Sequence, residues 1–277
     1  MEEKVAYLMK VRKYYAEEGM REWRRLVKDP YHRLEYDTTM HFLERYLPSK
    51  GLILDAGGGP GRYTIELARR GYRMVLLDLT PELLKIAKRR IRRAGIQAMV
   101  EGIVEGTITN LSIFNDECFD AVLCLGGVLS HLVRKSDRVK AIAELSRVVK
   151  RGAPLFISVI GRLAVLMRGL ADFPDLICED VFIKIRDSGD YYGKRGFAPC
   201  HFYLPEELIK ELKDQGLELL KIVGLEGIAS TRRREINRLY RKIPKAYKIW
   251  WKTHLKTCTH PGAIAISEHI LAVCTKP

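Results

Sequence analysis

The stretch LILDAGGGPGRYTIELARRGYRMVLLDLT, Leu52 to Thr80, decides how this chain folds. It begins with a short apolar run, passes through a cluster of glycines into a helical pattern, and ends with a second apolar run and an acidic residue. Short apolar runs bounded by glycine favour buried strands, and the pattern between them favours a helix. The stretch therefore predicts a βαβ unit of the kind that binds a nucleotide at its first turn.

The alternation of strand and helix continues beyond this unit. It is regular over residues 51–160 and resumes after residue 203. Such alternation requires right-handed crossovers and places helices on both faces of a mostly parallel sheet. We expect a doubly wound, Rossmann-like α/β fold with a seven-stranded, mostly parallel sheet.

Three segments stand outside this pattern. Residues 1–50 are predicted to form a helical cap or lid in front of an α/β domain that spans residues 51–277. Two insertions, at about 161–203 and 228–263, interrupt that domain. The first is predicted to contain a β-hairpin around Ser188 to Asp190, and the second to be helical and basic.

The glycine cluster does not match a dinucleotide-binding loop. That loop requires G-x-G-x-x-G or A, because a small third residue lets the helix pack closely on the strand. Counted from Gly57, the third position holds Arg62, and counted from Gly59 it holds Thr64. Neither register is compatible with a dinucleotide site.

The pattern present is D-x-G-x-G-x-G, formed by Asp55, Gly57, Gly59 and Gly61. Three glycines let the backbone turn sharply and lie flat against a ligand that lacks a pyrophosphate. Asp55 can accept a hydrogen bond from a cationic amine, and Asp78, at the end of the second strand, can accept from two ribose hydroxyls. A nucleoside that carries an amino acid, S-adenosylmethionine, fits these residues better than NAD.

These residues resemble motif I and the acidic motif II of class I S-adenosylmethionine-dependent methyltransferases, in particular the branch of ubiquinone/menaquinone-type and small-molecule enzymes. Residues 115–132, 144–158 and 201–227 are similar to later motifs of the family, so the resemblance covers residues 50–230. It implies methyl transfer from S-adenosylmethionine to an acceptor (EC 2.1.1 type), which leaves S-adenosylhomocysteine.

The resemblance also implies which residues hold the cofactor. Asp55 would hold the methionine part and Asp78 the ribose, with Leu79 beside the adenine. Family members often carry an Asp after the third strand; Thr107 stands there, so the adenine contact falls to its hydroxyl or to the Ile108 backbone. The expected cofactor-binding residues are Asp55, Gly57, Gly58, Gly59, Gly61, Asp78, Leu79, Thr107, Ile108 and Leu125.

Catalysis of methyl transfer depends mainly on holding nucleophile, methyl group and sulfur in line. Where a general base is needed, it must reach the nucleophile. His131, just after the fourth strand, is the best-placed candidate base, and a helix-start histidine satisfied by backbone is the equally weighted alternative. Candidate substrate-contacting residues are Tyr15, Tyr36, Tyr191 and His201, each with side-chain packing as its alternative role.

Composition indicates a compact folded protein. Of the 277 residues, 47% are hydrophobic and 30% are charged, which is enough apolar material for a large core. No apolar run approaches the roughly 18 residues of a membrane span, so we expect a cytoplasmic protein.

Asn and Gln are scarce beside Lys, Arg and Glu, a bias of thermophilic proteins. His254, Cys258 and His260 lack the paired spacing of a zinc site, and we expect no metal.

The net charge of +14 lies mainly in residues 221–277, which carry twelve basic and three acidic residues. Such a field favours anionic partners. We expect a small-molecule acceptor, which can be anionic. The alternatives are an RNA or protein methyltransferase that uses the basic C-terminal segment, and a protein that binds the cofactor without transferring the methyl group.

The aromatic residues of that segment weigh against nucleic acid. Apolar side chains recur there at helical spacing, which predicts a packing face with the charges on the solvated side. The predicted packing residues are Ile236, Leu239, Tyr240, Ile243, Tyr247, Trp250 and Trp251.

Overall fold

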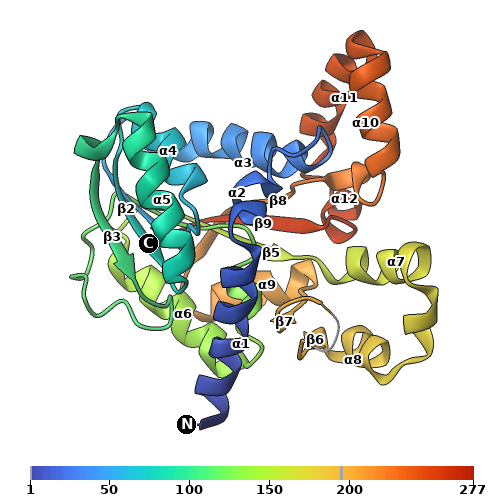
Figure 1. Cartoon of the computed structure of the whole chain (residues 1–277), viewed down its shortest axis with the longest axis horizontal. Coiled ribbons are helices and arrows are strands. Elements are labelled where there is room, and N and C mark those ends of the chain that lie inside the picture. The colour runs from blue at the N-terminus through green and yellow to red at the C-terminus, as the bar shows by residue number, and fades with distance from the viewer. Residues whose placement is uncertain (1, 194–195) are drawn as a thin grey trace.

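A computed structural model describes residues 2–193 and 196–277, with side chains from Tyr7 onward. Its centre is a seven-stranded sheet in the order β3-β2-β1-β4-β5-β9-β8, with helices on both faces (Figure 1). The predicted doubly wound α/β fold is confirmed. The strands of this sheet are β1 (Leu52–Ala56), β2 (Arg73–Asp78), β3 (Val100–Glu105), β4 (Ala121–Cys124), β5 (Pro154–Ile160), β8 (Glu218–Gly224) and β9 (His269–Thr275).

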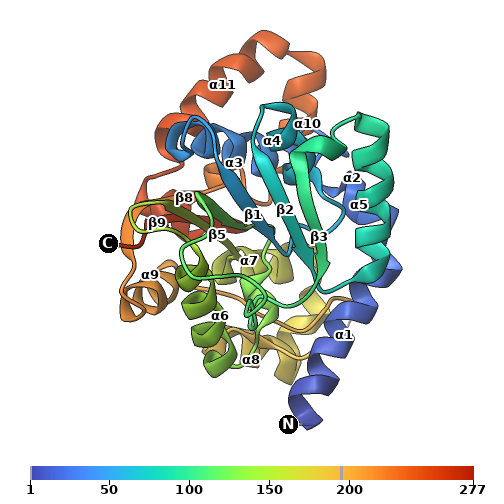
Figure 2. The same ribbon diagram turned by 90° about the vertical axis from the view of Figure 1, so that its left-hand side faces the viewer.

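Five helices cover the sheet. The first three, α3 (His32–Tyr46), α4 (Arg62–Arg69) and α5 (Pro81–Ala94), bury apolar side chains against one face, and α6 (Lys135–Val148) and α9 (Pro205–Asp214) cover the other (Figure 2). Strands β1 to β5 pair in parallel, whereas β9 runs antiparallel between β5 and β8. The carboxyl ends of β1, β2 and β4 therefore meet at one edge, where such folds bind ligands.

The helix ends within the first βαβ units largely follow the sequence signals. Gly61 adopts φ +80° before α4, and α5 begins with Pro81 and ends at Gly95, where φ is +69°. Thr80 occupies the position before α5, but its side chain makes no capping hydrogen bond to the helix.

The N-terminal segment contributes two more helices, α1 (Glu2–Glu18) and α2 (Met20–Arg25). They lie over the edge where β1, β2 and β4 end, and Leu8 and Val11 of α1 and Leu26, directly after α2, line a cavity there. The following helix, α3, instead packs on the face of the sheet.

The first insertion differs from its prediction. Residues 180–188 form a helix, because Val181, Phe182 and Ile185 recur at helical spacing and face a pocket. A two-stranded ribbon follows the turn instead of a hairpin around it. The elements are α7 (Arg162–Asp172), the 3-10 turn η3 (Pro174–Cys178), α8 (Asp180–Ser188), β6 (Asp190–Tyr191) and β7 (Cys200–His201).

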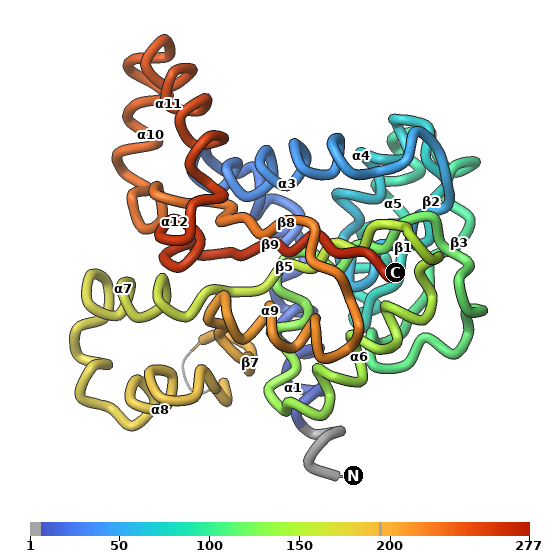
Figure 3. The backbone as a smooth tube through the Cα atoms, turned by 180° about the vertical axis from the view of Figure 1, so that it is seen from behind, coloured from blue at the N-terminus to red at the C-terminus, as the bar shows by residue number. Residues whose placement is uncertain are grey.

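The second insertion consists of α10 (Arg233–Lys242), α11 (Pro244–Thr257) and α12 (Pro261–Ala265), and the tube view separates α10 and α11 from the sheet (Figure 3). Tyr240 and Ile243 are exposed, so their predicted place on the packing face is wrong. Pro244 restarts the helix after an extended Ile243, and the helical spacing does not continue across that break.

No helix in the described ranges is long and apolar enough to cross a membrane. The remaining regular elements are short 3-10 turns: η1 (Gln97–Met99), η2 (Leu129–His131) and η4 (Gly227–Ala229).

Candidate functional site

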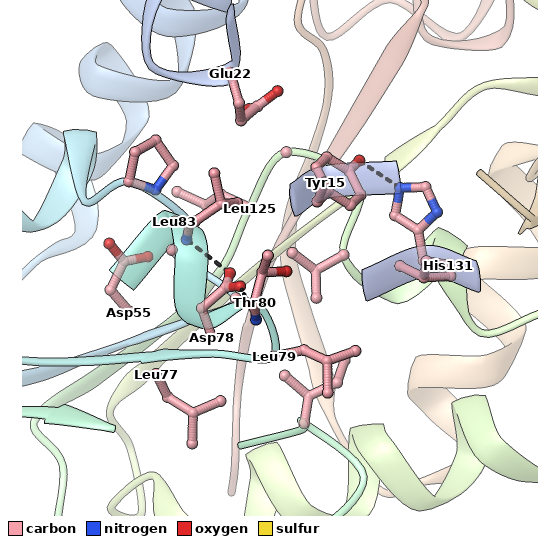
Figure 4. Close-up of a pocket in the computed structure, with 18 of the residues that line it drawn as sticks. Tyr15, Glu22, Asp55, Leu77, Asp78, Leu79, Thr80, Leu83, Leu125 and His131 are labelled. Carbon is pink, nitrogen blue, oxygen red and sulfur yellow. Dashed lines mark hydrogen bonds between the residues drawn. The ribbon is translucent and has the colours of Figure 1, made fainter. Parts of the chain in front are cut away.

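A cavity of about 120 Å³ lies at the carboxyl ends of β1, β2 and β4. We call it the glycine-loop cavity, and Figure 4 shows its lining. Nine of the ten residues expected to bind the cofactor line it, and the exception is Gly61. Strand ends and the loops that follow them thus bring the predicted set together.

The glycines of the loop serve two different purposes. Gly57 adopts φ +82°, donates its N–H to the Leu77 carbonyl at 2.7 Å, and leaves no room for a Cβ, which would lie 2.5 Å from Val128. Gly61 lies outside the cavity, where a Cβ would approach Ala87 at 3.3 Å. Gly57 therefore shapes the cavity wall, and Gly61 the turn into α4.

Two buried carboxylates are held by the backbone around the loop. One oxygen of Asp55 accepts from the N–H and the hydroxyl of Thr64, at 3.1 and 2.6 Å. The oxygens of Asp78 accept from the N–H groups of Gly59 and Thr80, both at 2.8 Å. Both carboxylates are fixed at strand ends and still have lone pairs for further donors.

Burial raises the pKa of both Asp55 and Asp78 to about 6, although their hydrogen bonds act in the opposite direction. Among the described residues, neither carboxylate forms an ion pair with a basic side chain. Buried carboxylates without a cation favour ligands that bring hydrogen-bond donors. An ammonium group and ribose hydroxyls are such donors, so the two carboxylate acceptors fit S-adenosylmethionine.

Apolar and hydroxyl side chains form the far end of the same cavity. Leu79 and Ile108, after β2 and β3, line it together with Thr107, whereas Leu125 lines the cavity after β4, on the other side of β1. The Thr107 hydroxyl lies 3.1 Å from that of Thr109. This end offers a planar apolar ligand a mostly aliphatic surface with one hydroxyl.

His131 and Tyr15 form a hydrogen-bonded pair on the opposite side of the cavity (Figure 4). The Tyr15 hydroxyl lies 2.7 Å from His131 Nε2, and His131 Nδ1 lies 2.9 Å from the Pro199 carbonyl oxygen. Because a carbonyl only accepts, Nδ1 carries the proton and Nε2 accepts from Tyr15. His131 is therefore both satisfied by backbone through Nδ1 and left with an unprotonated Nε2 hydrogen-bonded to Tyr15, so the two alternative roles coexist.

Burial sets the charge state of this pair. It lowers the pKa of His131 and raises that of Tyr15 well above the usual value. Both groups are therefore neutral near pH 7. The Tyr7 hydroxyl fixes the same turn by hydrogen bonding to the His131 carbonyl and the Val133 N–H.

Arg62 links the glycine loop to α2. It lines the cavity, stacks its guanidinium 4.2 Å over the Trp23 ring and donates to the Trp23 carbonyl. Arg62, which stands where a dinucleotide-binding loop requires a small residue, thus contacts the N-terminal segment and holds it against the glycine loop. Its partner could not be found from sequence spacing, because 39 positions separate the two residues.

A second cavity, of about 780 Å³, adjoins the first, and we call it the aromatic cavity. Tyr15, Glu22, Arg25 and Gly126 line both cavities. One end of the aromatic cavity is apolar, because α7, η3 and α8 turn their inner faces toward it. Side chains at that end include Val165, Phe173, Leu176, Phe182 and Ile185.

An ion-pair network that sequence reasoning missed forms another wall of the aromatic cavity. The Arg25 guanidinium donates to Glu35 at 2.5 Å, and His269 Nδ1 lies 2.8 Å from Glu226. Burial alone would lower the pKa of His269, but the carboxylates of Glu35 and Glu226 raise it to about 9. His269 is therefore protonated near neutral pH and shared by two glutamates.

The ligand atoms of Glu35, Glu226 and His269 lie within 4.8 Å of one another, close enough to hold a metal ion. In this structure the protonated His269 and Arg25 already neutralise the two carboxylates. The carboxylates are thus paired with cationic side chains of the protein. No spacing signal pointed to it, because its members come from α2, α3, β9 and the turn after β8.

The structure separates the remaining candidate substrate residues. Tyr191 lines the aromatic cavity. Tyr36 lines neither cavity and stacks on Tyr63, with ring centroids 5.5 Å apart. His201 lines neither cavity and hydrogen bonds to Asp190 at 2.8 Å. In this structure Tyr36 and His201 therefore take the packing role that was the alternative for each, and they lie outside both cavities.

Comparisons with known proteins agree with this geometry. A family model described as a methyltransferase domain matches residues 53–152. A ubiquinone biosynthesis O-methyltransferase from Xanthomonas axonopodis pv. citri is 28% identical over 193 residues, which are 70% of this chain and 71% of that protein.

Solved structures share the fold at low sequence identity. An S-adenosylmethionine-dependent methyltransferase from Methanosarcina mazei is 22% identical with a TM-score of 0.57, over 85% of this chain and 96% of that one. A geranyl diphosphate C-methyltransferase from Streptomyces coelicolor A3(2), solved with Mg²⁺, geranyl diphosphate and S-adenosyl-L-homocysteine, is 16% identical with a TM-score of 0.56, over 89% and 80%.

Proposed function

We propose that this chain, which belongs to the class I S-adenosylmethionine-dependent methyltransferases, transfers the methyl group to a small molecule held in the aromatic cavity. The observation that carries this proposal is the wall shared by the two cavities. Tyr15, Glu22 and Arg25 line both of them, so a ligand in one lies next to a ligand in the other. Proximity of the two reactants is the main requirement of this chemistry.

The residues of the glycine-loop cavity have separate tasks in binding the cofactor. Asp55 would accept from an ammonium group and Asp78 from ribose hydroxyls, while Leu79 and Ile108 would lie beside the adenine. Bound there, S-adenosylmethionine supplies an electrophilic methyl group on a sulfonium and leaves as S-adenosylhomocysteine. Arg62, through Trp23, would hold α2 as a lid that excludes water.

Tyr15 and His131 are placed to remove a proton from the acceptor. As the acceptor's oxygen or nitrogen bonds to the methyl carbon, its proton would pass to the Tyr15 oxygen while the Tyr15 proton passes to His131 Nε2. A raised Tyr15 pKa makes a free phenolate costly, so a concerted transfer is required. The Pro199 carbonyl keeps the His131 proton on Nδ1 and Nε2 available.

The lining of the aromatic cavity favours an acceptor with an apolar body. Its volume of about 780 Å³ lies in the range of small-molecule sites, and Phe173, Phe182 and Ile185 supply apolar surface. Relatives that are methyltransferases of small molecules agree with this assignment. Arg24 and Lys28 also line the cavity, which suits an acceptor with an anionic group.

Two measurements test the proposal. S-adenosylhomocysteine should raise the melting temperature of the protein and NAD should not; stabilisation by NAD alone would overturn the cofactor assignment. Labelled S-adenosylmethionine is then incubated with protein and cell extract. Label that survives nuclease and protease treatment supports a small-molecule acceptor, whereas label lost only after nuclease contradicts it.

We also propose a thermophilic source, on the scarcity of Asn and Gln beside charged residues, and we keep the sequence-based expectation of a cytoplasmic location. A melting temperature above about 65 °C, the upper end for mesophilic domains, is expected. Cell fractionation tests the location.

A further inference from the structure

The hairpin formed by α10 and α11 stands out from the α/β domain in all three views of the chain (Figures 1, 2 and 3). Residues 232–257, which we call the basic hairpin, contain ten Lys and Arg residues and one Glu. None of these residues lines either cavity. The charge of the basic hairpin therefore has no part in the proposed chemistry.

Helix α11 has two distinct faces. Its inner aromatic side chains, Tyr247, Trp250 and Trp251, pack against Tyr31 and Leu34. The outer face exposes lysines at intervals of three and four residues, which places them on one side of the helix. They have no ion-pair partner among the described residues. These are Lys245, Lys248, Lys252 and Lys256.

Large apolar side chains are exposed beside this charge. Ile243, between the two helices, is 55% exposed, and Ile249, next to Lys248, is 61% exposed. Tyr240 is exposed as well. Exposed aliphatic residues among lysines are typical of helices that lie in the interface of a membrane.

Helix α5 provides an internal comparison, because it is also strongly basic. Its apolar residues, among them Leu84 and Ile91, are buried against the sheet. Arg90 lies over the Trp23 ring. None of the exposed large apolar side chains of the described chain belongs to α5. Positive charge combined with exposed aliphatic surface is therefore a property of the basic hairpin and not of basic helices in this protein generally.

The same residues argue against nucleic acid as the partner. Single-stranded nucleic acids bind basic surfaces on which aromatic rings are free to stack with bases. In the basic hairpin Trp250 and Trp251 stack on His254 and face the domain. Of the three large apolar side chains that remain exposed, Ile243 and Ile249 are aliphatic and only Tyr240 is aromatic. Aliphatic groups gain more from acyl chains than from bases.

We propose that the basic hairpin binds the surface of an anionic lipid bilayer. The lysine face of α11 would meet the phosphate headgroups, and Ile243 and Ile249 would reach the boundary with the acyl chains. Because the basic hairpin lies outside both cavities, this proposal holds whether or not the proposed acceptor is correct.

Sedimentation of the full chain with lipid vesicles tests whether the lysine face of α11 binds anionic lipid. Binding is expected to vesicles of equal parts phosphatidylcholine and phosphatidylglycerol, and not to phosphatidylcholine alone. The double variant Lys248→Glu, Lys252→Glu should bind at least roughly 30-fold more weakly, because the loss of each lysine charge near the surface weakens binding about fivefold. The matched control is Lys85→Glu, Lys88→Glu on α5, which makes the same charge change and should bind within about threefold of the wild type.

The variant Ile243→Ser, Ile249→Ser distinguishes a lipid partner from a nucleic-acid partner, because it removes apolar surface and keeps every charge. It should weaken vesicle binding roughly tenfold and leave the binding of a fluorescent single-stranded RNA unchanged. Stabilisation of each variant by S-adenosylhomocysteine shows that it is folded. Equal losses in the two lysine variants, or unchanged vesicle binding by the isoleucine variant, would overturn the proposal; RNA binding that then depends on Lys248 and Lys252 would assign the basic hairpin to nucleic acid.

Discussion

The glycine-loop cavity and the aromatic cavity share a wall but are built differently. Asp55, Gly57 and Asp78 of the first come from a single βαβ unit and are separated by at most 23 positions. The aromatic cavity joins distant segments, since the Tyr31 hydroxyl donates to Glu268, 237 positions away. Local sequence thus shapes the cofactor end, and tertiary contacts shape the acceptor end.

The difference has a consequence for mutations. A change in the glycine loop alters a backbone conformation on which the proposed cofactor contacts depend. A change around the aromatic cavity removes one of many side chains and should alter turnover or stability in part. Substitutions in the glycine loop should therefore have larger effects than substitutions around the aromatic cavity.

Gly57→Ala should abolish detectable stabilisation by S-adenosylhomocysteine. The new Cβ would lie 2.5 Å from Val128 at φ +82°, so the loop should move to relieve about 3 kcal/mol of overpacking and left-handed strain. Restoring the original conformation on binding would then cost a similar amount, which corresponds to a loss of more than 100-fold in affinity. Gly71→Ala is the matched control, because Gly71 has φ +92° and open space around it. It should lose about 1 kcal/mol of stability and keep its affinity, measured by calorimetry. Equal affinities in the two variants would contradict the assigned role of the loop.

Tyr15→Phe should lower kcat roughly 100-fold, because it removes the hydroxyl between acceptor and His131. The affinity for S-adenosylmethionine should not change, so steady-state kinetics and a binding isotherm together separate chemistry from binding. Tyr36→Phe is the control, since Tyr36 lines neither cavity. A Tyr15→Phe enzyme with full kcat would show that the acceptor loses its proton elsewhere.

Asp78→Asn should weaken binding of S-adenosylhomocysteine roughly 10-fold or more, through loss of a charged acceptor. In the wild type, the affinity should rise with pH through about 6, because Asp55 and Asp78 ionise there and a carboxylate accepts better than a carboxylic acid. Calorimetric titrations from pH 5 to pH 8 measure the trend. Affinity that is flat over this range would show that neither carboxylate titrates on binding.

His269 should make stability depend on alkaline pH. Its pKa is raised in the folded state to about 9, so the stabilisation it contributes is complete below pH 6.5 and is lost as pH rises through 9. The melting temperature should therefore fall by a few degrees between pH 7 and pH 9.5. His269→Gln should start lower and show a smaller fall. If the melting temperatures of the wild type and His269→Gln fall in parallel with pH, His269 is not the group responsible for the loss of stability.

Much of the glycine-loop cavity could be predicted from sequence because its signals are local. Glycine is required where φ is positive, and an acid after an apolar run lies at a strand end. Nine of the ten expected residues line one cavity for this reason. Gly61 failed as a lining residue because its spacing fits both a cavity wall and a helix start.

The acceptor end could be predicted only in part. Tyr15 and His131 were candidates from separate arguments, but their contact across 116 positions depends on the path of α1. The Arg25, Glu35 and His269 network carries no spacing signal at all. Tyr36 and His201 show the converse case, in which a polar aromatic side chain from a segment near the site packs elsewhere and reaches neither cavity.

The shared wall also has a kinetic meaning. Side chains of α1 and α2 cover the glycine-loop cavity and at the same time line the aromatic cavity. If the cofactor enters past Tyr15, Glu22 and Arg25, an acceptor seated in the aromatic cavity would block its path. Substrates should then bind in a fixed order, with S-adenosylmethionine first and S-adenosylhomocysteine released last.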